Sequence, residues 1–561
     1  MNVLDWAVLA VTLATIVAYG VLKTRGVKTT AGFLKGDKDL RWPTIGLSVM
    51  ATQASAITFL STPGQAYDDG MRFVQFYFGL PLAMVLISAV AIPIYHRLQV
   101  FTAYEYLERR FDVRVRVLGA LLFLVQRGLA AGITIYAPAI VLSTLLGWRL
   151  DLTNLVIGIA VIIYTVSGGT KAVSQTQKQQ MIVIMTGMVL AAVVLFMRLP
   201  EAVGLGDVAR IAGATGRMEV VDFSFDFEDR YNFWSGLTGG FFLALSYFGT
   251  DQSQVQRYLS GRSVTEMRLG LLFNGIAKIP MQFFILGVGI LVFVLHVFEP
   301  APAFFNEPAW ARARAESPVA VEGLESELAE VQALRSRAAL AFVEADGDPA
   351  GARADFEAAD ARYQGLRRNA RSLVANSAPD AETEDGDYVF ISVVVELLPH
   401  GLIGLLIAVI LSAAMSSTAS ELSALGSTTT IDLYRRLVNP SADDATTLLA
   451  SKAFTVFWGL VALAFATFAS LLDNLIEAVN ILGSLFYGTV LGLFIVGFGL
   501  RRIGPGPTFY AALLGEALVI AAFFFTELGF LWFNVLGCGV TVGLALVFHL
   551  AGRLSLRPTE G

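Results

Sequence analysis

Apolar runs of roughly twenty residues recur along the whole chain and are separated by shorter polar connections. Because an α-helix rises about 1.5 Å per residue, about 20 apolar residues are needed to cross the roughly 30 Å hydrocarbon core of a bilayer. The pattern therefore predicts an all-α polytopic membrane protein. About thirteen transmembrane helices are expected, near residues 4–22, 43–66, 73–96, 117–146, 152–167, 178–199, 234–258, 269–298, 389–424, 451–471, 475–500, 508–527 and 530–552.

The composition agrees with this prediction and narrows the function. Of the 561 residues, 55% are hydrophobic and only 15% are charged, whereas soluble proteins are about a quarter charged. The single cysteine, Cys538, excludes a disulfide within the chain, and the four histidines are scattered at span ends. Because no nucleophile, base and metal ligands converge, neither an enzyme nor a nucleic-acid-binding protein is expected.

Lysine and arginine predict how the chain lies in the membrane. If thirteen spans are present, the connections on one face hold 23 of these residues, whereas the short connections on the other face hold only Arg72 and Arg149. Positively charged connections stay in the cytoplasm. We therefore expect an N-terminus outside and a C-terminus in the cytoplasm, in the plasma (inner) membrane.

The connection from about 300 to 388 differs from the rest of the chain. Between Glu307 and Asp387 it holds 9 arginines and 17 acids, a net charge of −8, while the whole chain carries −6. Apolar residues recur at helical spacing on either side of Gly347–Gly351, which predicts two amphipathic helices joined by a turn. We expect an acidic external helical hairpin without chemistry, while a docking or lid role stays open.

Two spans are interrupted midway by small and polar residues. The second contains such residues from Gly46 to Gly64, and the seventh contains them from Leu245 to Gln256. Irregular backbone is tolerated at membrane depth only where it lines a cavity or binds ions, although small residues also allow close helix packing. Since the two spans occupy matching places in two sets of five, a transport site is favoured.

The interruptions also predict the organisation of the chain. Spans 2–6 (residues 43–200) and 7–11 (234–500, interrupted by the insertion) form a 5+5 repeat, inverted because five is odd. Residues 1–42 are expected to form an extra span with a cytoplasmic loop, and residues 201–233 an external loop. Residues 501–561 are expected to form two spans with a short cytoplasmic tail.

The ninth span carries many hydroxyl groups. Ser416, Ser420, Ser423 and Ser427 follow one another at spacings of four, three and four, so they share one helix face. A hard monovalent cation binds oxygen ligands, which serine hydroxyls and free carbonyls supply without a fixed charge. Alternatively, such serines bond only to carbonyls of their own helix.

These motifs resemble the sodium:solute symporter family. The likeness covers nearly the whole chain outside the insertion, and Ile135–Ile140 is nearer the iodide and monocarboxylate branch than the sugar branch. The resemblance implies a LeuT-like inverted repeat with a central site and alternating access. The other segments that carry it are Ala413–Ser417, Ser427–Tyr434, Ala103–Phe111, Gly168–Val173 and Gly483–Gly488.

The resemblance also implies a sodium site and a solute site. The sodium ligands would be carbonyls of Ala51, Ala54 and Ala413 and hydroxyls of Ser416 and Ser417. Tyr247 matches an aromatic residue of the inner gate in sugar carriers. The positions that match solute-facing residues are Gln53, Thr58 and Tyr77, and the chemistry of the same segment adds Ser55.

One motif departs from the family pattern. The family usually places an acid near the start of the sixth span, where this chain has Gln177 followed by Lys178. An amide supplies no charge, so we expect one sodium ion per cycle. Lys178 either substitutes in part for a bound cation or is an ordinary lysine at the cytoplasmic edge.

Two charged residues lie deep in their spans. At about 1.5 Å per residue, Arg127 lies roughly 16 Å past Arg116, and Lys278 lies roughly 15 Å past Arg268. Charges at mid-membrane are costly and usually functional. Two unpaired cations in a cavity would favour a carboxylate solute. Alternatively, the two cations lie near the cytoplasmic mouth or pair with Asp251. The hydroxyl and amide groups of the predicted solute site would also suit a sugar, a polyol or an amino acid.

The leading hypothesis is thus a secondary active transporter, a sodium-coupled symporter of a small polar or anionic solute. A proton-coupled or sodium-independent carrier that uses Lys178 is the alternative on the same fold. A channel is disfavoured because paired broken helices imply an occluded site, and a sensor would be expected to carry a C-terminal signalling domain.

Overall fold

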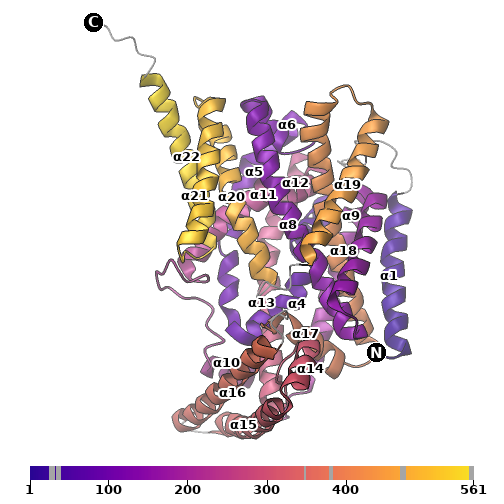
Figure 1. Ribbon diagram of the computed structural model, residues 1–561, viewed down its shortest axis with the longest axis vertical. Coiled ribbons are helices and arrows are strands. Elements are labelled where there is room, and N and C mark those ends of the chain that lie inside the picture. Colours follow the sequence, from indigo (N-terminus) through magenta and orange to yellow (C-terminus); the bar gives the residue numbers. More distant parts are fainter. Residues whose placement is uncertain (25–31, 33–38, 346–348, 378–382, 468–474, 555–561) are drawn as a thin grey trace.

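The apolar runs of the sequence form long helices that stand side by side in a bundle (Figure 1). This computed structural model describes residues 1–24, 32, 39–345, 349–377, 383–467 and 475–554. Among these residues, nine helices are long and apolar enough to cross a membrane, and no strand forms beyond an isolated bridge. The predicted all-α class is confirmed, whereas the count of thirteen spans and the sidedness stay predictions.

The elements of the N-terminal part include the first broken span. They are α1 (Val3–Thr24), α3 (Trp42–Gln53), α4 (Ala56–Asp69), η1 (Gly70–Tyr77), α5 (Leu80–Ala89), α6 (Ala91–Leu98), α7 (Tyr104–Arg110), α8 (Val113–Leu146), α9 (Leu150–Met197) and α10 (Leu205–Ala214).

The second broken span and the insertion belong to the C-terminal part. Its elements are η2 (Ser235–Gly239), α11 (Gly240–Gly249), α12 (Gln252–Leu259), α13 (Val264–Phe298), α14 (Glu307–Glu316), α15 (Pro318–Glu344), α16 (Pro349–Ser377), α17 (Gly386–Leu397), α18 (Leu402–Thr428), η3 (Thr429–Val438), α19 (Asp444–Ala466), α20 (Leu475–Gly499), α21 (Pro505–Phe525) and α22 (Leu531–Leu554).

Both interrupted spans break where the polar residues predict. Between α3 and α4, Ala54 has φ −87° and ψ 72° and Ser55 is extended. Between α11 and α12, Asp251 is extended, and its carboxylate accepts a hydrogen bond from the Ser253 N–H at 2.8 Å. The second break therefore carries its own helix cap, which supplies an acceptor for an N–H that the next helix leaves free.

The helical run α9 covers the fifth and sixth predicted spans together. Its first part packs against α19, where Gly158 lies against Leu463, and its second part packs against α18, where the Gln180 side chain donates to the Ser412 carbonyl at 3.1 Å. In place of the two separate helices predicted at 152–167 and 178–199, the structure thus has one continuous helix. Its second part places Gln177 and Gln180 against the hydroxyl-rich helix.

Four predicted segments lie wholly or partly outside the described residues. They are most of the connection at 23–41, part of the hairpin turn at 347–351, the end of the tenth span at 468–471 and the tail beyond residue 554.

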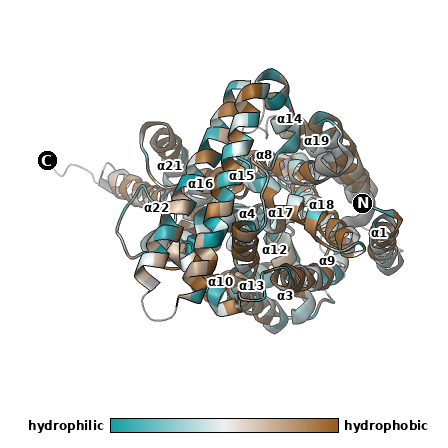
Figure 2. Cartoon of the chain, turned by 90° about the horizontal axis from the view of Figure 1, so that it is seen from below, coloured by the Kyte–Doolittle hydropathy of each residue, from teal (hydrophilic) through white to brown (hydrophobic). Residues whose placement is uncertain are grey.

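The insertion lies across one end of the bundle, on the side where the N-terminus also lies (Figures 1 and 2). Helices α15 and α16 run along each other there and show mixed hydrophilic and hydrophobic positions. Buried ion pairs join Arg335 to Asp360 at 2.6 Å and Arg367 to Asp385 at 2.7 Å. Burial lowers the pKa of Arg367, but Asp385 more than offsets it, so the net pKa is raised and the guanidinium stays charged.

The insertion also contacts the second half of the first broken span. Arg371 of α16 pairs with Asp68 near the end of α4 at 3.1 Å, and Arg217 donates to the Tyr67 carbonyl at 2.8 Å while lying 3.7 Å from Asp360. The hairpin is therefore tied to α4 rather than freely solvated.

Candidate functional site

The two helix breaks lie beside one central cavity. Its volume is about 70 Å³, and residues from α3, α4, η1, α8, α11, α18 and α20 line it. Six of the seven residues predicted to face the solute line this cavity, namely Gln53, Ser55, Thr58, Tyr77, Arg127 and Tyr247. Ten further residues line the cavity and are not predicted to face the solute, among them Phe76, Thr134, Glu421, Asn480 and Tyr487.

Arg127 is held between two acids, so the expectation that it is unpaired is wrong. Its guanidinium pairs with Asp251 at the break between α11 and α12 and with Glu421 of α18 at 3.0 Å. The Tyr487 hydroxyl donates to the same Asp251 carboxylate at 3.0 Å, and the Thr134 hydroxyl donates to Glu421 at 2.8 Å. The alternative of a pair with Asp251 is confirmed, and a single buried network joins α8, the second break, α18 and α20.

Lys278 lies deep in the protein but not at the cavity wall. Its side chain is fully buried in α13, and its Nζ has no hydrogen-bond partner among the described residues. The Nζ lies 5.4 Å from the ring centroid of Tyr77, which does line the cavity. Lys278 is thus the one predicted solute-facing residue that reaches the cavity only through another side chain.

The residues of the predicted sodium site lie on two packed elements. Helix α18 contacts both α3 and α4, and it carries Ala413, Ser416 and Ser417. In the part of the chain that the structure describes, no main-chain N–H is bonded to the carbonyls of Ala51 or Ala54. The break therefore leaves carbonyl oxygens available for an ion.

The serines differ in their hydrogen bonds. Ser417 donates to the Ala413 carbonyl at 3.0 Å, which is the internal bonding that the alternative interpretation expects. A donating hydroxyl still has oxygen lone pairs for a cation. The Ser416 hydroxyl is buried and has no partner among the described residues, so at least one predicted ligand is free to bind.

Gln177 occupies the position where the family usually has an acid. Its side-chain oxygen accepts from the Ser48 hydroxyl at 2.5 Å, and its Nε2 donates to the hydroxyls of Thr52 at 2.9 Å and Ser420 at 3.1 Å. The amide therefore joins α3, α9 and α18 without a charge. Lys178 beside it is half-buried, and no ion pair of it is found among the described residues.

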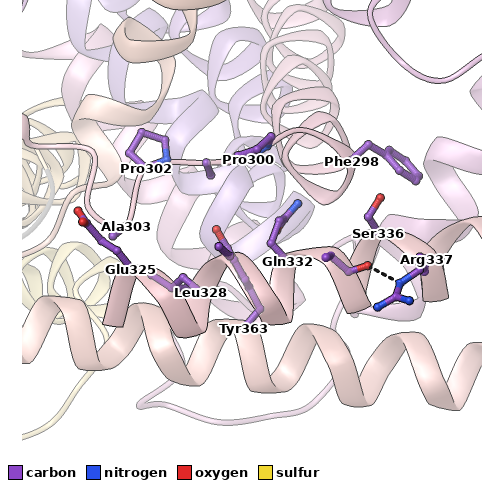
Figure 3. A pocket seen from close by; sticks show the side chains of 13 residues that line it. Phe298, Pro300, Pro302, Ala303, Glu325, Leu328, Gln332, Ser336, Arg337 and Tyr363 are labelled. Carbon is purple, nitrogen blue, oxygen red and sulfur yellow. Dashed lines mark hydrogen bonds between the residues drawn. The ribbon is translucent and has the colours of Figure 1, made fainter. Parts of the chain in front are cut away.

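A larger hollow lies outside the bundle (Figure 3). It has a volume of about 620 Å³ between the segment after α13 and helix α15, and its lining includes Phe298, Pro302, Gln332 and Tyr363. No predicted sodium or solute residue lines it. The candidate site is therefore the smaller central cavity.

Comparison with known proteins agrees with this geometry. The model of the sodium:solute symporter family matches residues 33–328 and 370–515. The chain belongs to the sodium:solute symporter family. The stretch between the two matched regions includes the second part of α15 and the first part of α16 in the insertion.

Several sodium-coupled carriers resemble this chain in sequence. The human sodium/iodide cotransporter is 34% identical over 297 residues, which are 52% of this chain and 45% of that protein. Sodium-coupled monocarboxylate transporter 2 from Bos taurus is 26% identical over 524 residues, 93% of this chain and 72% of that protein. The match thus spans about half the length of the iodide cotransporter.

A solved structure shows the fold of the chain. A Na⁺-coupled sialic acid symporter in a substrate-bound outward-open state superimposes with a TM-score of 0.75 and 22% identity, covering 98% of each chain. The LeuT-like architecture that the family resemblance implies is therefore confirmed.

Proposed function

We propose that this symporter carries a small polar organic solute across the plasma (inner) membrane, driven by one sodium ion per cycle. The observation that supports it most is that both helix breaks lie beside one central cavity, the second through the pair of Asp251 with Arg127, while the hydroxyl-rich α18 packs against the first break. A central site between broken helices suits alternating access rather than a continuous pore.

Sodium would couple to the solute by holding two elements together. Its proposed ligands are the carbonyls of Ala51, Ala54 and Ala413 and the hydroxyls of Ser416 and Ser417. These five oxygens belong to the first break and to α18, so an ion stabilises the conformation in which the two are close. A ligand that binds one conformation better shifts the population toward it, which is the basis of coupling.

The class of solute depends on the charges at the cavity. A carboxylate is favoured when Arg127 and Lys278 are both unpaired, but Arg127 is neutralised by Asp251 and Glu421, and Lys278 does not line the cavity. Gln53, Ser55 and Thr58 supply amide and hydroxyl groups that suit a sugar, polyol or amino acid. The structure thus weakens the argument for a simple carboxylate.

The first prediction concerns the sodium ligands. Replacing Ser417 by alanine removes one oxygen ligand. We expect the sodium concentration that gives half-maximal thermal stabilisation to rise roughly tenfold, because that change in affinity corresponds to the free energy of about one hydrogen bond to a charged group. The measurement is a sodium titration of the melting temperature of the purified protein. Ser423→Ala is the matched control, because Ser423 is a buried serine of the same helix outside the proposed ligand set. Unchanged sodium dependence in Ser417→Ala would remove this residue from the site.

The second prediction concerns the number of ions. Gln177→Asp supplies the acid that the family usually has, so we expect a steeper sodium dependence of solute-induced stabilisation, with more than one ion bound per solute. Gln180→Asp places an acid one turn away on the same helix and serves as the control. Equal steepness in both variants and the wild type would contradict the role assigned to Gln177.

A further inference from the structure

The buried network at the wall of the central cavity has more negative than positive groups. Three charged side chains meet in this network, where one positive charge on Arg127 faces two carboxylates, Asp251 and Glu421. Asp251 is saturated, because its oxygens also accept from the Ser253 N–H at 2.8 Å and hydroxyl at 2.6 Å and from Tyr487 at 3.0 Å. The surplus charge therefore belongs to Glu421.

Glu421 is also the acid that faces the cavity. It accepts from Arg127 at 3.0 Å and from the Thr134 hydroxyl at 2.8 Å, and it lines the cavity, whereas Asp251 does not. A carboxylate accepts about four hydrogen bonds in all, so this one keeps capacity for a further donor. A surplus buried carboxylate is costly unless a bound cation or a proton neutralises it.

Aromatic rings line the same cavity. Tyr77, Tyr247 and Tyr487 belong to η1, α11 and α20, and the rings of Tyr247 and Tyr487 lie 5.9 Å apart. Arg127 lies 5.3 Å from the Tyr247 ring centroid, and Lys278 approaches Tyr77, so these two rings already contact cations. Aromatic faces attract positively charged nitrogen, and carboxylate with aromatic rings is the combination that recognises ammonium groups.

A second hollow continues this charge pattern toward the insertion. It has a volume of about 480 Å³, and Glu477 of α20 lines it. Glu477 follows Ile476, which lines the central cavity, and its carboxylate accepts a hydrogen bond from the Gln65 side chain at 3.4 Å. Three arginines line it, namely Arg72, Arg217 and Arg230. Six acids line it as well, namely Asp68, Asp69, Glu219, Glu228, Asp229 and Glu477. A cleft with excess negative charge concentrates cations and disfavours anions.

We propose that the transported solute carries a positively charged nitrogen, which Glu421 and the surrounding tyrosines bind in the central cavity. The proposal rests on the proposed function and selects the class of its solute. The nitrogen supplies the charge that Arg127 leaves uncompensated, while Gln53, Ser55 and Thr58 bind polar groups elsewhere on the molecule. A solute with only a carboxylate would add a second unpaired negative charge.

Three probes of similar size and different charge test the proposal. Ethanolamine, ethylene glycol and glycolate share a hydroxymethyl group and differ at the other end, which is an ammonium, a hydroxyl or a carboxylate. A compound that binds the native protein stabilises it by mass action. In sodium, we expect ethanolamine to raise the melting temperature of the purified protein more than either neutral or anionic probe.

The variant Glu421→Gln shows whether Glu421 is responsible. It keeps the shape and removes the charge, so the ethanolamine concentration for half-maximal stabilisation should rise at least roughly tenfold, as expected for a hydrogen bond to a charged group. Glu516→Gln is the control, since Glu516 is a buried acid of α21 that does not line the cavity. The same probe should bind that variant as it binds the wild type.

The outcomes separate this proposal from the proposed function. Stabilisation by sodium without any preference for ethanolamine, or an equal preference in Glu421→Gln, would overturn the ammonium proposal and leave sodium binding intact. Failure of sodium to stabilise the wild type relative to potassium would instead contradict the proposed function.

Discussion

Replacing Arg127 by methionine is expected to lower the free energy of unfolding by about 3–5 kcal/mol, because it leaves two buried carboxylates without their shared cation. Arg127 is nearly inaccessible and joins Asp251 at the second break to Glu421 on α18. The same change should abolish solute-dependent stabilisation, since the network forms part of the cavity wall. Thermal denaturation of the purified protein measures both effects.

Two further variants show whether charge is the cause. Adding Asp251→Asn and Glu421→Gln to Arg127→Met removes the unpaired carboxylates, so most of the lost stability should return. Arg149→Ala breaks an exposed pair with Asp151 and should change stability little. A loss in Arg127→Met no larger than in Arg149→Ala would show that the network does not stabilise the fold.

A side chain at Gly64 is expected to have the second large effect. In Gly64→Ala the new Cβ would overlap the carbonyl oxygen of Gly386, where α4 packs against the start of α17. Backbone atoms cannot move aside cheaply, so we expect the free energy of unfolding to fall by about 3 kcal/mol, the upper end for overpacking, with loss of transport.

The matched control is Gly287→Ala on α13. No atom lies within 4 Å of a Cβ at that position. Alanine also stabilises a helix more than glycine does, so the control substitution should leave the free energy of unfolding unchanged or raise it. Equal melting temperatures for the two variants would show that the close approach of α4 and α17 is not required.

The sequence is most informative about the breaks in the spans. The segment around Ala54 and the segment around Asp251 are rich in small and polar residues, which lipid would tolerate only around a cavity or ion. That single constraint predicts both breaks. Six of the sixteen residues that line the cavity are predicted, and four of these six, Gln53, Thr58, Tyr77 and Tyr247, are implied by the family resemblance. The constraint does not predict that one helix continues from one expected span into the next, as α9 does through the fifth and sixth spans.

The sequence offers the pair of Arg127 with Asp251 only as one alternative, and it does not predict the pair with Glu421. Depth counting places Arg127 inside the membrane, but its partners lie 124 and 294 residues away, and depth does not show which helices are neighbours. The sequence does contain a signal for Glu421, because it is the one charged residue between Leu402 and Thr428, the residues of α18. An acid in such a span indicates a functional site by itself.

The sequence also does not predict which neighbours a buried side chain contacts. Lys278 and Arg127 look alike by depth, yet one contacts a tyrosine behind the cavity wall and the other lines the cavity. Helical position sets the face that each residue occupies, but the packing of α13 against its neighbours decides what that face meets.

The most direct test of sodium-coupled transport is uptake into proteoliposomes. The probe is a radiolabelled solute that stabilises the purified protein in sodium, supplied under an inward sodium gradient or a matched potassium gradient. We predict saturable accumulation that requires the sodium gradient and disappears when a sodium ionophore dissipates it. Equal uptake in potassium, or flux that does not saturate with solute, would contradict a sodium-coupled carrier.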